Sequence, residues 1–106
     1  MEWKRVCPLA EIVEGETRAV ALAGGTALLC RAAGDEVFAI EDHCTHDEGP
    51  LGAGRLYGHV IECPRHGAEF DVRTGAVQRL PAVLPLRTWP ARVREGWVEV
   101  AEGEGP

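Results

Sequence analysis

Two short segments of this sequence each offer one thiol and one imidazole at close spacing. Cys44 is followed two residues later by His46, and Cys63 is followed three residues later by His66. Thiolates and imidazoles are both good ligands for transition metals. Two loops that each supply one of each can hold a pair of metal ions asymmetrically. These four residues are therefore the candidate metal site.

The spacing leaves two kinds of centre open. A [2Fe–2S] cluster held by two cysteines and two histidines uses this ligand set. Two cysteines and two histidines also hold structural zinc, but finger-type zinc sites usually pair cysteine with cysteine and histidine with histidine. Here each cysteine is paired with a histidine, and residues 47–62 separate the two pairs. This order favours the iron–sulfur centre over zinc.

Histidine ligands would give such a cluster two properties. A neutral imidazole in place of an anionic thiolate leaves the oxidised cluster less negative, so that adding an electron costs less. Mixed centres accordingly have potentials of about −150 to +300 mV, against about −400 mV for all-cysteine plant-type clusters. The distal ring nitrogen of each histidine can also carry a proton, which couples proton uptake to electron uptake.

Composition bounds the kind of protein that carries this site. The chain has 106 residues, which is enough for one domain with a core but too few for several catalytic modules. A formal net charge of −6 disfavours nucleic acid and anionic lipid as partners and favours a partner with a basic face. No apolar stretch reaches membrane-spanning length, and residues 1–5 lack the apolar segment of a secretory signal. We therefore expect a cytoplasmic monomer with no nucleic acid or membrane partner, whose thiols are available to metals.

The pattern of apolar residues predicts an all-β fold. Helical periodicity is weak, and short apolar stretches alternate with closely spaced glycines. The first four predicted strands are expected to form a meander, residues 42–58 a functional loop, and the proline-rich residues 80–90 a connector or edge strand. A tight hairpin-like loop is expected to carry the second Cys/His pair, and residues 73–75 are expected to turn the chain back. Residues 91–94 and 97–100, joined by Glu95-Gly96, are expected to form a closing hairpin. The predicted strands are residues 3–7, 17–23, 27–32, 37–41, 60–62, 69–72, 91–94 and 97–100.

The other residues with possible chemistry receive structural interpretations. Cys7 and Cys30 lie in strand-like segments without a partner at ligand spacing, so we expect both in the core. His43 and His59 have no cysteine two or three residues before them and are left out of the site. The three tryptophans are interpreted as core residues: Trp3, Trp89 and Trp97. An acidic run around the first pair is either a solvated loop or a docking surface: Glu41, Asp42, Asp47 and Glu48.

At this point the sequence resembles a known family. Cys44-Thr45-His46 with Gly49-Pro50-Leu51, and Cys63-Pro64-Arg65-His66-Gly67, are similar to the two cluster-binding boxes of the Rieske family. The likeness extends through residues 60–63, 70–75 and 80–82 to the small ferredoxins of bacterial aromatic-ring dioxygenase systems.

The resemblance implies a fold and a ligand arrangement. The fold is a Rieske-like antiparallel β base, here residues 1–41 and 84–106, with a small cluster-binding subdomain inserted at about residues 42–83. One [2Fe–2S] cluster is implied. In this family the two cysteines hold a buried iron and the two histidines the outer iron, which places Cys44 and Cys63 on the first and His46 and His66 on the second.

The same resemblance implies a function. The protein is expected to be a soluble one-electron carrier that accepts electrons from a flavin-dependent reductase and passes them to a terminal oxygenase, without catalysis of its own. One alternative is a Rieske-like small subunit of an assimilatory nitrite reductase. Another is a non-redox interaction module with zinc or no metal.

The sequence also departs from part of the family. High-potential Rieske proteins of respiratory complexes have a disulfide between the boxes, where this chain has Gly49 and Arg65. They also place a serine and a tyrosine as hydrogen-bond donors to the cluster, where this chain has Ala68 and Phe70. Fewer donors to sulfur stabilise the reduced state less, which predicts a potential near the lower end of the Rieske range.

Overall fold

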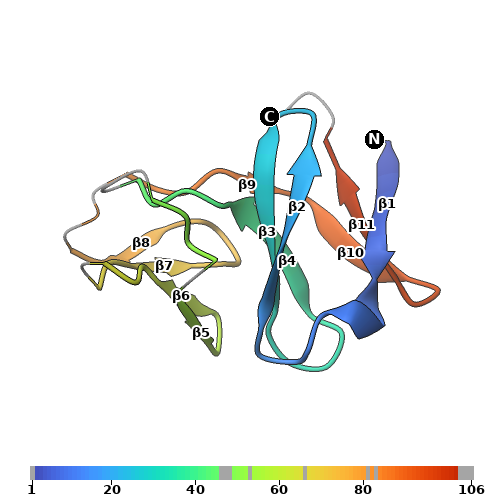
Figure 1. Cartoon of the computed structure of the whole chain (residues 1–106), viewed down its shortest axis with the longest axis horizontal. Coiled ribbons are helices and arrows are strands. Elements are labelled where there is room, and N and C mark those ends of the chain that lie inside the picture. The colour runs from blue at the N-terminus through green and yellow to red at the C-terminus, as the bar shows by residue number, and fades with distance from the viewer. Residues whose placement is uncertain are drawn as a thin grey trace.

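Short antiparallel strands form the framework of the described residues (Figure 1). The structure is a computed structural model, and it describes residues 2–45, 49–52, 54–65, 67–80, 82 and 84–102. Within these ranges the only helix is a single 3₁₀ turn, η1. The predicted all-β fold class is confirmed.

The strands follow one another closely along the chain. Their bounds are β1 (Trp3–Pro8), β2 (Thr17–Leu22), β3 (Gly25–Arg31), β4 (Val37–Glu41), β5 (Arg55–Tyr57), β6 (Val60–Glu62), β7 (Glu69–Asp71), β8 (Val77–Arg79), β9 (Thr88–Trp89), β10 (Ala91–Arg94) and β11 (Trp97–Ala101), with η1 (Leu9–Glu11) between β1 and β2.

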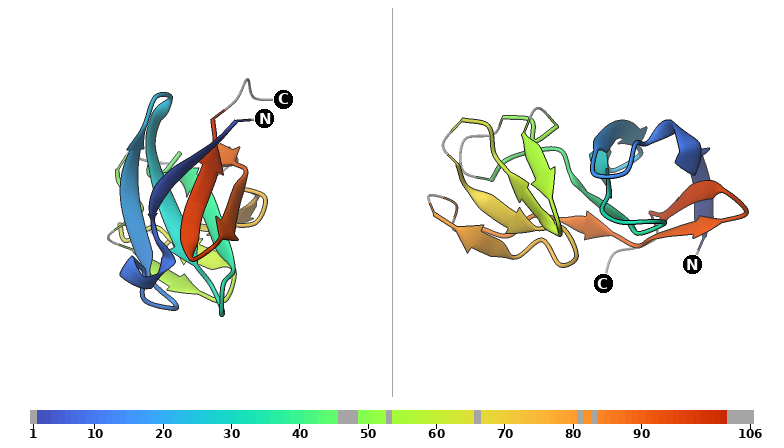
Figure 2. Two further views of the ribbon diagram at one scale, coloured as in Figure 1. Left: turned by 90° about the vertical axis from the view of Figure 1, so that its right-hand side faces the viewer. Right: turned by 90° about the horizontal axis from the view of Figure 1, so that it is seen from below.

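The strands form three sheets. Two of them, with strand orders β1-β11-β10 and β2-β3-β4-β9, lie together on the right of Figure 1. The third sheet, β5-β6-β7-β8, lies on the left, beyond the end of β4. Figure 2 shows the same separation from below, with the segment that contains β9 leading back from the third sheet to the other two. The two candidate cysteines, Cys44 and Cys63, pack with residues of the third sheet.

The predicted four-strand meander is wrong in its first member. β2, β3 and β4 do pair in sequence order, but β1 pairs with β11, so that Trp3 lies opposite Ala101. The 3₁₀ turn η1 follows β1 directly, and the N–H of Leu9 donates to the carbonyl of Gly96, 2.9 Å away. Ile12, directly after the turn, is only 1% exposed. Burial of these side chains between two sheets outweighs the tendency of neighbouring strands to pair.

Other predicted elements are confirmed, and two strands were missed. β10 and β11 form the predicted closing hairpin, with Glu95 and Gly96 both at positive φ (54° and 80°), as a two-residue type I′ turn requires. The proline-rich connector supplies an edge strand, β9. β5 lies inside the expected 42–58 loop and β8 follows the predicted turn at residues 73–75. Each has three residues, too few to show an alternating pattern.

Two apolar clusters fill the interior. One lies between the first two sheets and includes Cys7, Ile12 and Trp89. The other joins β3 and β4 to the third sheet and contains both candidate cysteine ligands. Its buried members are Leu28, Cys30, Ile40, Cys44, Leu51, Ile61, Cys63, Ala68, Phe70, Val72, Ala82 and Leu86. The site therefore shares its core with the strands that support it.

The tryptophans do not all enter the core. Trp89 is buried, at 7% exposed, whereas Trp97 is 36% exposed and Trp3 is half-buried. The guanidinium of Arg5 lies 5.4 Å from the ring centre of Trp97, and that of Arg92 lies 4.1 Å from the ring centre of Trp3. The core interpretation is therefore confirmed for Trp89 and wrong for Trp97. The ring of Trp97 lies at the surface in cation–π contact with Arg5.

The same two arginines surround a buried carboxylate. Glu99 on β11 is 6% exposed, and its carboxylate accepts hydrogen bonds from Arg92 Nε at 2.7 Å and Arg5 Nε at 3.3 Å. The bonds from Arg92 and then Arg5 lower the pKa of Glu99 despite the opposing effect of burial. Because β1, β10 and β11 each contribute one of these side chains, the group ties the N-terminal strand to its sheet.

This arrangement predicts a loss of stability in acid. A carboxyl group whose pKa is lower folded than unfolded adds stability above its unfolded pKa of about 4.3, and this stability is lost as the pH falls through the folded pKa. Glu99→Gln should therefore have a lower free energy of unfolding at neutral pH and a smaller decrease on acidification. Urea unfolding of both proteins across this pH range measures the difference. Parallel curves for the two proteins would contradict the assignment.

Candidate metal centre

Cys44 lies three residues beyond the end of β4, at the base of the first box. Its side chain is fully buried, at 0% exposed. Its backbone N–H donates to the carbonyl of Gly49 at 2.7 Å, which closes the intervening loop. The cysteine is therefore held at the inner end of that loop, next to the core.

Cys63 follows β6 directly and begins the loop to β7. It is 1% exposed, and its N–H donates to the carbonyl of Ala68 at 2.7 Å. The N–H of Gly67 donates back to the carbonyl of Cys63 at 3.2 Å, and Gly67 has a φ of +75°, a conformation that glycine adopts without strain. The predicted tight hairpin-like loop is confirmed, because β6 and β7 pair as antiparallel neighbours.

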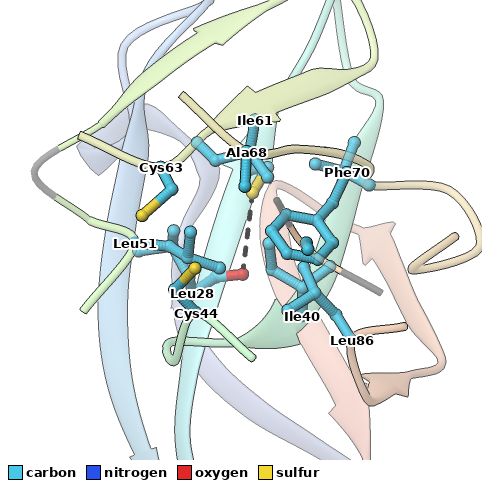
Figure 3. Packing of buried hydrophobic residues seen from close by; sticks show 12 residues of the cluster. Leu28, Ile40, Cys44, Leu51, Ile61, Cys63, Ala68, Phe70 and Leu86 are labelled. Atoms are coloured by element: carbon cyan, nitrogen blue, oxygen red, sulfur yellow. Dashed lines mark hydrogen bonds between the residues drawn. The ribbon is translucent and has the colours of Figure 1, made fainter. Parts of the chain in front are cut away.

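The fold brings these two cysteines together from separate loops. Both belong to the same buried cluster as Leu51. In Figure 3 the side chains of Cys63 and Cys44 lie on either side of Leu51, with both sulfur atoms beside it. Both residues are thiols rather than half-cystines. Two buried thiols from two loops in one core match the sulfur half of the expected ligand set.

The positions of the two candidate histidine ligands are not described by the structure. His46 and His66 lie outside the described residues, as do Asp47 and Glu48 of the acidic run. Among the residues that are described, no three cysteine, histidine or acidic side chains gather at one point. The donor chemistry present nevertheless fits a [2Fe–2S] cluster, because thiolate is the ligand that iron–sulfur clusters require and each buried thiol begins a segment that contains one of the two histidines.

Two acidic residues before Cys44 support the loops. Oδ1 of Asp42 accepts hydrogen bonds from the N–H of Leu51 at 2.8 Å and of Gly52 at 2.9 Å. Oε1 of Glu41 accepts one from the N–H of Arg87 at 2.7 Å. These two members of the acidic run are thus bonded within the molecule, a role that their sequence did not reveal. Carboxylates that accept backbone N–H groups in turns are the signal that could have indicated it.

Further contacts connect the boxes to the connector between β8 and β9. The hydroxyl of Thr45 donates to the carbonyl of Leu84 at 2.7 Å. The N–H of Leu86 donates to the carbonyl of Gly75 at 2.8 Å, and Gly75 has a φ of +82°. The connector is therefore fastened to the first box and also to the turn after β7.

The cysteines and histidines outside the two boxes are buried or half-buried. Cys7 and Cys30 are 3% and 0% exposed, which confirms both as core residues. Burial, followed by the charge of Asp42, raises the pKa of the Cys30 thiol to about 12. Nε2 of His59 lies 3.1 Å from a carboxylate oxygen of Glu36, outside the boxes. His43 is half-buried.

The positions that depart from high-potential proteins lie close to the two thiols. Ala68 and Phe70 are both 0% exposed and belong to the buried cluster that holds Cys44 and Cys63. Neither side chain has a hydroxyl group, so neither can donate a hydrogen bond to sulfur.

Comparison with known proteins gives one family over most of the chain. Residues 2–90 match the family model of the Rieske [2Fe-2S] domain. Ferredoxin CarAc of Metapseudomonas resinovorans is 40% identical over 99 residues, which are 93% of this chain and 92% of that protein. The solved ferredoxin of carbazole 1,9a-dioxygenase from Nocardioides aromaticivorans IC177 superposes with a TM-score of 0.89 at 37% identity, over 95% of this chain and 98% of that one.

Two further solved structures bear on the function. A complex of reduced oxygenase and oxidized ferredoxin in carbazole 1,9a-dioxygenase contains a chain with a TM-score of 0.88 and 37% identity, covering 98% of this chain and 96% of that one. A protein described as the small subunit of an NADPH nitrite reductase has a TM-score of 0.83 but only 18% identity. The second likeness shows the fold alone. No helix in the described ranges is long and apolar enough to cross a membrane.

Proposed function

Since this chain belongs to the Rieske [2Fe–2S] family, we propose that it is the ferredoxin of a multicomponent oxygenase system, which takes electrons from a flavin-dependent reductase and delivers them to a terminal oxygenase. The chain is an electron carrier rather than a catalytic subunit, and its cofactor is one Rieske-type cluster. The observation that carries the proposal is the whole-length match to ferredoxin CarAc, which covers 93% of this chain and 92% of that protein.

We further propose that Cys44 and Cys63 bind the inner iron and that His46 and His66 bind the outer iron. A [2Fe–2S] cluster bound there supplies a one-electron redox couple. The two cysteines lie in an apolar core that excludes water from their side of the cluster. The two histidines would hold or release a proton at the distal ring nitrogen as the charge of the site changes.

The proposed partners fit the charge of the chain. Its net charge of −6 would attract a partner with a basic docking face and steer the encounter. The complex of oxygenase and ferredoxin among the similar structures supports a terminal oxygenase as acceptor. We propose that the protein works as a monomer in the cytoplasm, where a reducing environment keeps ligand thiols available. We also propose residues 1–41 and 84–106 as a base and about 42–83 as the cluster-binding insertion.

A test of the function begins with the purified protein. Equimolar iron and acid-labile sulfide, a brown colour and an EPR signal after dithionite reduction would support a redox centre, whereas colourless zinc protein would support an interaction module. The loaded protein is then mixed with a flavin-dependent reductase and a Rieske oxygenase of an aromatic-ring dioxygenase system. We expect electron transfer whose rate falls with added salt, because salt screens charge steering. Co-purification with a sirohaem-containing large chain would instead support the nitrite reductase alternative.

The absence of hydroxyl groups at positions 68 and 70 predicts a low potential. The midpoint should lie near about −150 mV rather than +300 mV. Phe70→Tyr and Ala68→Ser should each move it to more positive values, because a donor to sulfur stabilises the reduced cluster. Spectroelectrochemistry on the loaded protein measures the shift. A clearly positive midpoint in the unmodified protein would refute the prediction.

The chain offers a matched control for this change. Its second phenylalanine, Phe38, lies on β4 with its ring centre 5.7 Å from that of His59. Phe38→Tyr adds the same hydroxyl group at the other phenylalanine, whose ring packs against His59. The potential of this variant should stay at the value of the unmodified protein.

A further inference from the structure

Asp42 occupies an unusual place between the base and the first box. Its backbone N–H donates to the carbonyl of Thr26, at 3.1 Å, which fastens it to β3. One oxygen of its side chain accepts hydrogen bonds from the N–H groups of Leu51 and Gly52, at 2.8 and 2.9 Å. The residue thus joins the supporting sheet to the far end of the loop that starts at Cys44.

The segment that Asp42 holds is the one that packs beside both thiols. Leu51 is 0% exposed and lies next to the sulfur atoms of Cys44 and Cys63 in Figure 3. Gly49 accepts the N–H of Cys44 at one end of the segment, and the carbonyl of Leu51 accepts the N–H of Gly54 at the other. The side chain of Asp42 supplies a further restraint on this segment, at Leu51 and Gly52.

The charge of Asp42 also reaches this core. Its Oδ1 accepts the N–H of Leu51, and the side chain of Leu51 lies beside the sulfur atoms of Cys44 and Cys63. A carboxylate held at this place disfavours an added electron, because the electron would bring a second negative charge close to the first.

We propose that Asp42 is a positioning residue of the cluster site, whose carboxylate keeps residues 49–52 closed beside Cys44 and whose negative charge holds the potential of the bound cluster low. This inference rests on the proposed function, because it requires a cluster between the two boxes. The residue two positions before Cys44 would thus help to retain the cluster and to set its potential.

Glu41 provides the matched comparison. It is adjacent to Asp42, carries the same charge and also accepts a backbone N–H, at 2.7 Å, but its donor is Arg87 on the connector rather than the box loop. A variant at Glu41 removes one carboxylate and one hydrogen bond without releasing residues 49–52. If a variant acts only by destabilising the whole protein, substitutions at Glu41 and at Asp42 should have similar effects. Release of residues 49–52 should follow only from substitution of Asp42.

The experiment uses the cluster-loaded protein with Asp42→Asn, Asp42→Ala and Glu41→Ala. Asparagine keeps an oxygen that accepts both N–H groups but removes the charge, whereas alanine removes both. The readouts are the rate of iron release to a chelator under anaerobic conditions, the EPR spectrum and the midpoint potential. We expect Asp42→Ala to release iron about tenfold faster or more, since two hydrogen bonds to a charged group are lost. Asp42→Asn should lie between it and the unmodified protein, and its potential should be more positive.

The outcomes separate the inference from the proposed function. Iron release from Asp42→Ala at the rate of Glu41→Ala, or a potential of Asp42→Asn that is unchanged or lower, would overturn the inference. If Asp42→Ala takes up no cluster while Glu41→Ala does, the positioning role is supported. The Asp42→Asn potential remains decisive if neither alanine variant loads. Failure of the unmodified protein to bind a cluster would instead refute the proposed function.

Discussion

Replacing Cys63 by serine is expected to remove the iron–sulfur cluster. The side chain is 1% exposed at the start of the loop between β6 and β7, so no solvent ligand can reach its place easily. A hydroxyl group stays protonated at neutral pH and is a poor substitute for a thiolate on iron. Cys44→Ser should have the same effect, because Cys44 is equally buried and belongs to the same core. Iron and sulfide content, the visible spectrum and EPR measure the loss.

Cys30→Ala is the control for this prediction. Cys30 is also 0% exposed in the same buried cluster, but it lies on β3 outside both boxes and its thiol points to the carbonyl of Leu28, 3.8 Å away. Its replacement should cost about 1 kcal/mol of stability and leave the cluster in place. If Cys63→Ser kept the spectrum and electron transfer of the unmodified protein, the ligand assignment would be wrong.

Gly54→Ala is expected to prevent the loop before β5 from closing. A Cβ added to Gly54 would overlap the backbone carbonyl oxygen of Glu62, the residue that precedes Cys63. Neither backbone can move freely, because Gly54 donates its N–H to Leu51 at 2.9 Å and Glu62 ends strand β6. We expect a loss of about 3 kcal/mol or more in the free energy of unfolding, with poor cluster uptake. Denaturant unfolding and iron content after reconstitution measure both effects.

A second glycine of the same loop separates steric overlap from glycine replacement in general. A Cβ at Gly52 would meet Leu28 at 3.4 Å and the carboxylate of Asp42 at 3.7 Å, which are ordinary contacts. Gly52→Ala also keeps the N–H that Asp42 accepts. This variant should fold and bind the cluster almost normally. Equal stability of the two variants would show that the close approach of Gly54 to β6 is absent in solution.

Features that depend on near neighbours in the chain could be predicted. The Cys-x-His and Cys-x-x-His spacings indicated the ligand types, and the Glu95-Gly96 turn indicated the closing hairpin, which the structure confirms. Both are local patterns, because a tight turn and a pair of ligands on one loop involve only a few consecutive residues. The assignment of Cys44 and Cys63 to the inner iron and of His46 and His66 to the outer iron stays a prediction, as does the division of the chain into base and insertion.

Features that depend on distant residues could not be predicted. The pairing of β1 with β11 and the hydrogen bond from Arg5 to the buried Glu99 each join residues that lie far apart in the sequence. Asp42 looked like one more exposed acid in a charged loop, and only the packed chain shows its backbone N–H bonded to the carbonyl of Thr26 on β3. A sequence pattern reports what a residue could bind, but its actual partners depend on how the whole chain packs.

The amino-acid sequence by itself determined the chemistry on offer, two thiols and two imidazoles on short segments of an acidic β-rich chain, because side-chain types and local spacing are properties of the sequence. Only the tertiary structure decided that Cys44 and Cys63 share one buried core, and that β1 pairs with β11. The physical reason is that burial and long-range hydrogen bonds exist only once distant strands have packed, so no short stretch of the chain contains them.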